Sequence, residues 1–277
     1  MQVTRQTGLV KPSQPSKPSK ESAMSAVATP STTRTHRPQA TLKKALVTGA
    51  TSGIGRAAAL QLAREGFEVV VHGRDEKRGA EAVREIEKAG GKASFVAAEL
   101  GSVEDVKRLA EAAGDVDVLV NNSGSAWFGT TESLDPRTYD EMFNGNVRAT
   151  YFVTAAIAPR MAARGTGSII NVGSVAGSVG LAGGAAYSAT KAALHAFTRA
   201  WAAEYSPRGV RVNAVAPGPV HTAIVPRDRT DAIGETTLLK RAAEASEIAE
   251  VIAFLASPKS SYITGAIVAA DAGRGAI

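Results

Sequence analysis

Tyr187 and Lys191 have the residue types and the spacing of an acid–base pair. They lie four positions apart in a stretch of helical character, so both side chains project from the same helix face. An ammonium one turn from a phenol favours the phenolate, and we expect it to lower the pKa of Tyr187 toward neutral pH. Ser174, thirteen residues before Tyr187, can bring its hydroxyl to the same substrate oxygen. Each residue alone is better explained as a helix aromatic, a surface cation or a loop residue, and only the combination indicates proton transfer.

A glycine-rich segment, Thr48-Gly49-Ala50-Thr51-Ser52-Gly53-Ile54-Gly55, joins a predicted strand to a predicted helix. Its glycines permit a tight turn and a close approach of the backbone to a ligand. The helix that follows offers free N–H groups and the positive end of its dipole. The pyrophosphate of a dinucleotide fits such a site, although a glycine-rich turn also arises simply to connect strand to helix. The glycines have the spacing G-x-x-x-G-x-G, which differs from the commoner dinucleotide-binding spacing G-x-G-x-x-G.

The end of the second predicted strand, His72-Gly73-Arg74-Asp75, bears on which dinucleotide binds. An enzyme that prefers NAD usually has a carboxylate here for the ribose 2′-hydroxyl, whereas an arginine pairs with the 2′-phosphate of NADP. Gly73 occupies the position of the acid and Arg74 follows it, while Asp75 is explained as the N-cap of the next helix. We expect NADP(H), with NAD(H) as the alternative. The plain explanation of Arg74 is a solvated turn residue.

Short β-branched runs alternate with alanine-rich helical stretches and position these residues. Strands are predicted at Ala45–Thr48, Glu68–His72, Ala93–Ala97, Val116–Asn121, Ser168–Val172, Val210–Val215 and Ala266–Ala270. Helices are predicted at Ile54–Glu65, Asp75–Lys88, Val103–Ala113, Tyr139–Arg164, Ala185–Tyr205 and Ser246–Leu255. Apolar strands that are each followed by a helix indicate a parallel sheet covered on both faces. The predicted fold is a single α/β domain over residues 41–277, a Rossmann-like, doubly wound, seven-stranded parallel sheet that binds ligands at the carboxyl ends of its strands.

The composition excludes several classes of protein. The 277 residues are 44% hydrophobic and contain no cysteine, which excludes disulfides, thiolate metal sites and cysteine nucleophiles. The four histidines show no metal-ligand spacing, so no metal site is expected. No apolar run approaches the ~18 residues needed to span a bilayer, so no membrane partner is expected.

Residues 1–40 differ in composition from the rest of the chain. They contain five of the twelve prolines, twelve Ser or Thr, six basic residues and one acid, and so carry +5 of the formal charge of +6. We predict a disordered basic extension, with an organelle transit peptide as a less favoured alternative. The remaining chain is close to neutral, which argues against a nucleic-acid partner. The cytoplasm is the expected location.

Taken together, the motifs resemble the short-chain dehydrogenase/reductase family over Leu42 to Gly273. The segment Thr48–Gly55 is similar to the family's T-G-x-x-x-G-x-G, and Ser174, Tyr187 and Lys191 are similar to its S…Y-x-x-x-K set. The further similarities are Asn121-Asn122-Ser123-Gly124 to N-N-A-G, Asn146 to the helix asparagine, Pro217-Gly218 with Thr222 to P-G-x-x-x-T, and Asp271-Ala272-Gly273 to the closing D-G-G.

The resemblance implies hydride transfer between a nicotinamide and a carbonyl or secondary alcohol. It implies that Tyr187 is the general acid/base, that Ser174 orients the substrate oxygen and that Lys191 lowers the tyrosine pKa and holds the ribose hydroxyls. It further implies that Asn146 anchors a water that relays protons. The residues it implies for cofactor binding are Gly49, Thr51, Ser52, Gly53, Ile54, Gly55, Arg74, Glu99, Leu100, Asn122, Ser123, Gly124, Tyr187, Lys191, Pro217, Gly218, Val220 and Thr222.

The chain departs from the family pattern at three places. Glu99-Leu100 stands where an aspartate commonly meets the adenine amino group, and the longer side chain can still accept that bond. Ser123 replaces an alanine, and Gly173 replaces a frequent second serine before Ser174. None of these changes removes a reacting group.

The substrate is less visible in the sequence. We expect the pocket among residues 125–128, 175–184 and 219–242, the last resembling a mobile lid, with Trp127 and Phe128 either forming an apolar wall or packing under a loop. The chain is similar to 3-oxoacyl-acyl-carrier-protein reductases and to sugar or general alcohol dehydrogenases. A basic patch for a carrier protein is available but weakened by Asp228 and Asp231; its members are Arg227, Arg229, Lys240 and Arg241.

Two further expectations follow from the resemblance. A homotetramer is implied, built through residues 139–164, residues 185–205 and the C-terminal strand. A non-catalytic protein that senses NADP is a remote alternative, because such relatives usually lack the tyrosine or the lysine and this chain has both.

Overall fold

A seven-stranded parallel sheet forms the centre of the computed structural model, which describes residues 43–277; the extension predicted for residues 1–40 lies outside the described residues. The sheet has the order β3-β2-β1-β4-β5-β6-β7. Its strands are β1 (Lys44–Val47), β2 (Glu68–Gly73), β3 (Lys92–Ala97), β4 (Val118–Asn121), β5 (Gly167–Val172), β6 (Val210–Pro217) and β7 (Ile267–Ala270). All seven predicted strands are confirmed, as is the Rossmann-like, doubly wound fold.

Two hydrophobic cores, one on each face of the sheet, explain why the strands are apolar along their length. In β1, Val47 belongs to one core and its neighbour Leu46 to the other. Leu46 pairs with Val70 of β2 and Leu119 of β4, and these three side chains share the second core. Because successive strand residues point to opposite faces, a strand covered on both sides needs apolar residues at every position.

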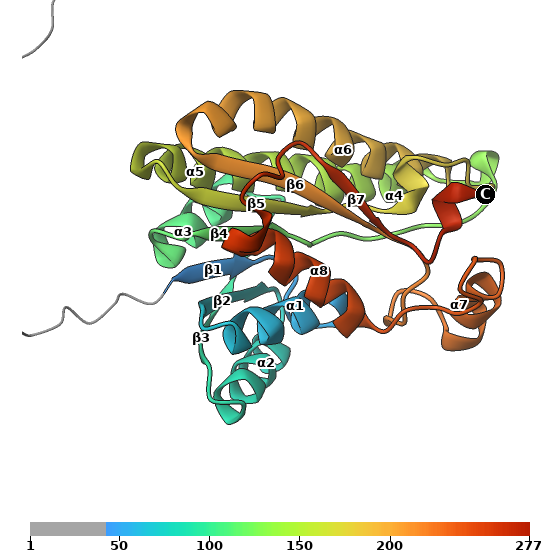
Figure 1. Cartoon of the computed structure of the whole chain (residues 1–277). Coiled ribbons are helices and arrows are strands. Elements are labelled where there is room, and N and C mark those ends of the chain that lie inside the picture. Colours follow the sequence, from blue (N-terminus) through green and yellow to red (C-terminus); the bar gives the residue numbers. More distant parts are fainter. Residues whose placement is uncertain (1–42) are drawn as a thin grey trace, which may run out of the picture. The chain divides into compact units, whose positions relative to one another are not determined.

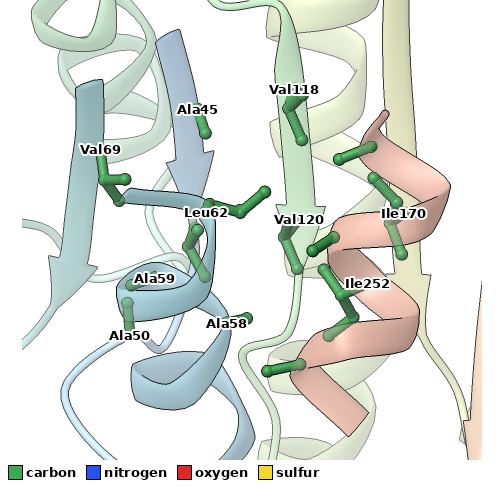
Figure 2. Packing of buried hydrophobic residues seen from close by; sticks show 14 of the residues in the cluster. Ala45, Ala50, Ala58, Ala59, Leu62, Val69, Val118, Val120, Ile170 and Ile252 are labelled. Carbon is green, nitrogen blue, oxygen red and sulfur yellow. The ribbon is translucent and has the colours of Figure 1, made fainter. Parts of the chain in front are cut away.

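Helices cover both faces of the sheet (Figure 1). The first core packs against α1 (Gly53–Arg64), α2 (Glu76–Lys88) and α8 (Ala245–Ala256). The second core packs against α3 (Val103–Ala113), α5 (Ala149–Arg164) and α6 (Ala185–Tyr205). Figure 2 shows Leu62 of α1 and Ile252 of α8 reaching into the first core beside Val120 and Ile170 of the sheet.

The helix predicted at Tyr139–Arg164 is composite in the structure. It begins earlier, at Pro136, where Asp135 caps the first turn by accepting the N–H of Thr138 at 3.0 Å. After α4 (Pro136–Phe143) the chain makes a π-helical turn, Asn144–Arg148, and continues as α5. The prediction missed the π turn because the side-chain period stays close to helical through it. Such turns are frequent at functional sites.

The stretch of irregular polarity after β6 contains a helix that the sequence did not predict, α7 (Arg227–Gly234). The segment that carries it is held at its base by a parallel bridge between Val220 and Ala243. Two backbone bonds close this bridge: the N–H of His221 donates to Ala243 O at 2.9 Å, and the N–H of Ala243 donates to Pro219 O at 2.9 Å. We call residues 222–242, which leave and return at this point, the lid.

The strand order places the chemistry at one edge of the sheet. The order reverses between β1 and β4, and in such sheets the crevice at the carboxyl ends of the strands beside the reversal is the ligand site. The glycine-rich segment follows β1, Ser174 follows β5, and the lid follows β6. Among residues 43–277, no helix is both long and apolar enough to cross a membrane.

Candidate active site

Ser174, Tyr187 and Lys191 meet at the carboxyl end of β5. Tyr187 and Lys191 lie in the first two turns of α6, and Ser174 begins the 3₁₀ turn after β5, where its Oγ accepts the N–H of Ala176 at 3.2 Å. The Ser174 side chain hydrogen-bonds to the phenol of Tyr187. The Nζ of Lys191 lies 5.7 Å from the centre of the Tyr187 ring and donates to Val172 O at 3.0 Å. The predicted grouping of these three side chains is therefore present.

The protonation of this group differs from the expectation at Tyr187. Burial raises the pKa of the Tyr187 phenol, and the hydrogen bond with Ser174 only partly opposes the rise. Burial also lowers the pKa of Lys191 to about 8. The expected lowering of the phenol's pKa by Lys191 is therefore absent: burial and the Ser174 hydrogen bond are the causes of the shift, and Lys191 Nζ donates to Val172 O. The chain's own residues keep Tyr187 protonated at neutral pH, as a proton donor requires.

Asn146 is fully buried in the π-helical turn, and its side chain holds two neighbouring segments in place through hydrogen bonds. Its Oδ1 accepts the N–H of Ser125 at 2.8 Å, and its Nδ2 donates to Ser125 O at 2.9 Å and to the Thr190 hydroxyl at 3.0 Å. Thr190 in turn donates to the backbone carbonyl of Tyr187 at 2.7 Å. Asn146 thus ties the loop after β4 to the turn that carries Tyr187. Its expected role as the anchor of a relay water stays a prediction.

The glycine-rich segment has the form of an anion cradle. Gly49 and Gly53 have φ of 63° and 54°, a region that favours glycine, and a side chain at Gly55 would overlap the Gly49 carbonyl. At the start of α1, Ser52 makes no side-chain cap bond and the first turn carries no acid. The free N–H groups and the positive helix end are therefore available, so these residues fit a dinucleotide pyrophosphate.

Residues that follow β4 hold this cradle in place through hydrogen bonds. The Thr48 hydroxyl accepts the N–H groups of Asn122 and Ser123 at 3.0 and 3.1 Å. The Asn122 side chain donates to the carbonyls of Thr48 and Gly49 at 2.9 and 3.1 Å. Gly124 is also required by packing, since a Cβ there would lie 2.8 Å from Asn146 Oδ1. The N-N-S-G segment thus positions the cradle relative to the catalytic group.

His72 is a positioning residue that the sequence reasoning missed. It is 2% exposed, its Nδ1 accepts the N–H of Gly49 at 3.2 Å, and its Nε2 lies 3.1 Å from Ala98 O. An N–H can only donate and a carbonyl can only accept, so the ring is neutral with its proton on Nε2. His72 fastens the cradle to β2 and to the turn after β3. A histidine inside an otherwise apolar strand was the available signal.

We expect protonation of His72 to lower the stability of the folded protein below neutral pH. Burial lowers the pKa of His72 from 6.5, and burial also lowers the pKa of His195. Because the unfolded chain takes up these protons first as pH falls, the free energy of unfolding declines below about pH 6.5, by at most about 1.4 kcal/mol per pH unit for each histidine. In His72→Asn, thermal unfolding between pH 7.5 and 5.5 should therefore depend less on pH than in the wild type. Equal slopes for the two proteins would contradict this role.

His195 explains why glycine replaces the frequent serine at position 173. A Cβ at Gly173 would lie 2.5 Å from His195 Nε2, and one at Gly177 would lie 2.9 Å from His195 Cε1. The imidazole of α6 thus occupies the space beneath the loop that carries Ser174. Glycine at position 173 leaves room for the His195 ring, and the position of Ser174 is unaffected.

The adenosine end of the predicted site lies at the ends of β2 and β3. Arg74 and Glu99 are both exposed and form an ion pair at 3.5 Å. A side chain at Gly73 would meet the Thr51 methyl at 2.5 Å, so a carboxylate does not fit there without moving Thr51. Leu100 is 7% exposed and its side chain belongs to the second core, and its expected part in cofactor binding stays a prediction.

A cavity of about 740 Å³ joins the catalytic group to the cradle and the lid. The predicted site residues that line it are Ile54, Asn122, Gly124, Ser174, Tyr187, Lys191, Pro217, Gly218, Val220 and Thr222. Thr222 also approaches the cradle, since a Cβ at Gly53 would lie 3.3 Å from its methyl group. The other predicted residues shape the cradle, the adenosine end or the support behind Tyr187.

The two aromatic residues expected at the pocket have different positions. Phe128 lines the cavity and packs edge-on against Tyr187, with ring centres 5.4 Å apart. Trp127 is not among the lining residues. Its ring occupies the space where a Cβ at Gly129 would lie, at 2.5 Å, so it packs within its own loop. The wall interpretation holds for Phe128 and the packing interpretation holds for Trp127.

Comparison with known proteins agrees with the fold. Residues 43–232 match the short chain dehydrogenase family. The 3-oxoacyl-[acyl-carrier-protein] reductase FabG of Staphylococcus epidermidis is 39% identical over 239 residues, covering 83% of this chain and 98% of that protein. A solved short chain dehydrogenase/reductase family protein is 44% identical with a TM-score of 0.79, covering 85% of this chain and 98% of that one.

A second similar solved structure contains a cofactor. It is a variant of actinorhodin polyketide ketoreductase with NADPH, 33% identical with a TM-score of 0.81, covering 85% of this chain and 98% of that one. With the family matched over most of the described residues, the chain belongs to the short-chain dehydrogenase/reductase family of nicotinamide-dependent oxidoreductases.

Proposed function

We propose that the protein is an NADP(H)-dependent reductase that converts a carbonyl compound into a secondary alcohol, with Tyr187 as the general acid. The observation that carries the proposal is the convergence of Ser174, Tyr187 and Lys191 on one cavity that also reaches the helix end at Ile54. A proton donor, a hydroxyl and a cation therefore surround the point where a substrate oxygen would lie, beside the cradle that fits a dinucleotide.

Each residue of the site has a separate role in the proposed reaction. The nicotinamide, when bound, supplies the hydride that the carbonyl carbon accepts. Tyr187 donates its phenolic proton to the carbonyl oxygen as negative charge develops there, and the Ser174 hydroxyl donates a hydrogen bond to the same oxygen. Lys191 is in place to hold ribose hydroxyls. Asn146 keeps the start of α6 and the loop after β4 in register.

The preference for NADP(H) rests on the end of β2. Gly73 has no room for the acid that would receive a ribose 2′-hydroxyl, because Thr51 occupies that space. Arg74 follows at once and is exposed, and within residues 43–277 its one ion-pair partner is the exposed Glu99. An exposed ion pair of this kind is weak, so Arg74 can turn to a 2′-phosphate at little cost. The NADPH in the related ketoreductase structure supports the same choice.

Replacing Arg74 tests this preference. We expect Arg74→Ala to raise KM for NADPH by about tenfold to a hundredfold, the worth of a charge-assisted hydrogen bond to phosphate, and to leave KM for NADH within about twofold. Glu99→Gln is the matched variant, because it frees Arg74 from its carboxylate and should lower KM for NADPH. Equal effects of Arg74→Ala on the two cofactors would show that Arg74 does not read the 2′-phosphate.

The carrier-protein alternative is supported by the relatives and weakened by the lid. FabG proteins are among the similar sequences. In the expected basic patch, however, Arg227 pairs with Glu244 at 3.1 Å and Arg241 pairs with Glu247 at 2.7 Å. Two of its four cations are thus neutralised. We propose 3-oxoacyl carrier-protein reduction, and sugar or general alcohol oxidation with NAD, as secondary candidates.

A homotetramer is part of the proposal. Its support is an aromatic group between α5 and α6, in which Tyr151 lies 5.7 Å from Phe197 and 6.1 Å from Trp201 between ring centres. Tyr151 is 46% exposed, so this group presents apolar surface. An exposed tyrosine on α5 that packs against aromatic residues of the neighbouring long helix suits an interface between copies of the chain.

The function is tested by following the oxidation of NADPH and NADH with ketones, β-keto esters and acyl thioesters. We expect turnover that prefers NADPH and is lost in Tyr187→Phe. Cofactor binding without turnover in this panel and in the reverse panel of alcohols with NADP⁺ would support the remote alternative, a non-catalytic sensor. Failure to bind either cofactor would overturn the assignment of the cradle.

A further inference from the structure

The charged residues of the cavity are all of one sign. Within the described residues, its lining includes Lys191, Arg229 and Arg274 and contains no Asp or Glu. Lys191 belongs to the catalytic group, but Arg229 and Arg274 have no part in the proposed chemistry. A concave surface lined by one sign of charge concentrates ligands of the opposite sign.

Arg229 is presented to the cavity by one face of α7. Arg229, Ala232 and Ile233 line the cavity, and their spacing of three and four residues places them on one side of the helix. Thr230 of the same helix and Thr236, which follows it, also line the cavity. The acids of the same segment face elsewhere. Asp231, for example, lies 3.1 Å from His221 Nε2 at the base of the lid.

The partners of Arg229 set it apart from the neighbouring arginines. Arg227 and Arg241 are each engaged by a glutamate. Within residues 43–277 Arg229 forms no ion pair, and its guanidinium carbon lies 5.9 Å from the centre of the Phe128 ring. An exposed cation–π contact is weak, so the guanidinium is available to an anion.

Arg274 enters the cavity from the C-terminal turn, Arg274–Ala276. Asp271 holds that turn, with its two oxygens accepting the N–H groups of Gly273 at 3.0 Å and Gly275 at 2.7 Å. The nearest acid is therefore committed to backbone amides, and Arg274 makes no ion pair within the described residues. The turn lies beside the catalytic loop, since a Cβ at Gly275 would be 3.5 Å from a Val175 methyl.

An apolar stretch separates Arg229 from the reacting position. The Tyr187 ring lies 5.4 Å from Phe128, and Phe128 lies 5.9 Å from Arg229, so the guanidinium is no farther from the phenol ring than these two distances combined. The apolar residues that complete this part of the cavity wall are Val175, Val179, Leu181, Ile224, Val225 and Ile233.

We propose that the substrate carries an anionic group, a carboxylate or a phosphate, which Arg229 and Arg274 bind, and that an apolar segment joins this group to the reacting carbonyl. The inference rests on the proposed function for the identity of the reacting carbonyl. The charge pattern itself predicts anion binding independently of turnover. The two guanidinium groups suit either anion, because both present paired oxygens to a planar donor.

The first test measures binding alone. Octanoate and the neutral methyl octanoate are titrated into the protein loaded with NADP⁺ and followed by calorimetry. We expect octanoate to bind about tenfold or more tightly than the ester, and this advantage to disappear in Arg229→Gln and in Arg274→Gln. Arg229→Lys should retain part of it. Arg227→Gln is the matched control on the same helix, because its side chain pairs outside the cavity, and it should bind like the wild type.

The second test measures turnover and separates the two sources of negative charge. Keto acids of increasing chain length are compared with their methyl esters, and a 3-oxoacyl phosphopantetheine thioester is compared with the N-acetylcysteamine thioester, which lacks the phosphate. We expect kcat/KM to favour the charged member of one pair by about tenfold to a hundredfold, and Arg229→Gln to bring the ratio of kcat/KM between the charged and the neutral member close to one.

Several results would overturn the anion site. One is equal binding of octanoate and its ester. Another is an equal loss for charged and neutral substrates in Arg229→Gln, or a change confined to the affinity for NADP⁺, which would assign Arg229 to the cofactor. If octanoate binds as expected but no carbonyl compound is reduced, the anion site stands and the proposed reductase function is overturned.

Discussion

Replacing Tyr187 by Phe is expected to lower kcat for carbonyl reduction by roughly 10²–10⁴, the usual worth of a positioned general acid. The phenol is the proton source beside the Ser174 hydroxyl, and burial raises its pKa, so it holds a proton at neutral pH that phenylalanine lacks. The ring would keep its edge-on contact with Phe128, and the affinity for NADPH should change by less than about twofold. Cofactor oxidation followed by absorbance and a fluorescence titration of NADPH measure the two effects.

Tyr205→Phe is the matched control for this experiment. Tyr205 ends the same helix, is 7% exposed and is not among the cavity-lining residues, so it reports the cost of removing a buried phenol from α6 without touching the site. We expect its kcat to stay near that of the wild type. A comparable loss in both variants would attribute the Tyr187 effect to the stability of α6, and full activity in Tyr187→Phe would refute the general-acid role.

Replacing Lys191 by Met is expected to lower kcat/KM for NADPH by about 10²-fold or more. The methionine fills much of the buried space, but it cannot donate to Val172 O or hold ribose hydroxyls. In the wild type, the pKa of Lys191 near 8 predicts that kcat/KM declines as pH rises above about 8, because the side chain then loses its charge. Rates measured from pH 6 to 10 test both statements.

Stability and activity should move in opposite directions over this pH range. The pKa of Lys191 is about 8 in the folded protein against 10.5 as the ordinary value, so the unfolded chain binds the extra proton between these limits. The contribution of Lys191 to the free energy of unfolding therefore rises as pH increases from 8 to 10.5. Lys191→Arg should move the decline in activity to higher pH, since a guanidinium stays charged. A decline at the same pH in Lys191→Arg would mean that another group is responsible.

Local patterns were sufficient for the fold and for the central chemical group. The apolar strands had to be buried on both faces because successive side chains of Val69 and Val70 enter different cores. The pairing of Tyr187 with Lys191 followed from the helical period, which places residues four apart on one face. The cradle followed from glycines whose positions admit no side chain. Tyr187 and Lys191 are close in sequence, so spacing alone predicts that they share one helix face.

The positions that were missed or altered depend on partners far along the chain. His72 became a support of the cradle only through Gly49 and Ala98, and Asn146 became a positioning residue through Ser125 and Thr190. The π turn and α7 were likewise missed, because their side-chain patterns resemble an ordinary helix and an irregular loop.

Protonation and cavity charge also came from packing between distant elements. The direction of the Tyr187 pKa shift depends on burial, which outweighs the hydrogen bond with Ser174, and spacing does not predict burial. The all-cationic cavity arises because α7 and the C-terminal turn bring Arg229 and Arg274 together with the catalytic loop, while the nearby acids are held by other partners. The sequence by itself therefore identified Ser174, Tyr187 and Lys191 as the candidate reacting residues. Their protonation and the charge of the cavity were decided by three-dimensional contacts, because desolvation and charge pairing act through space.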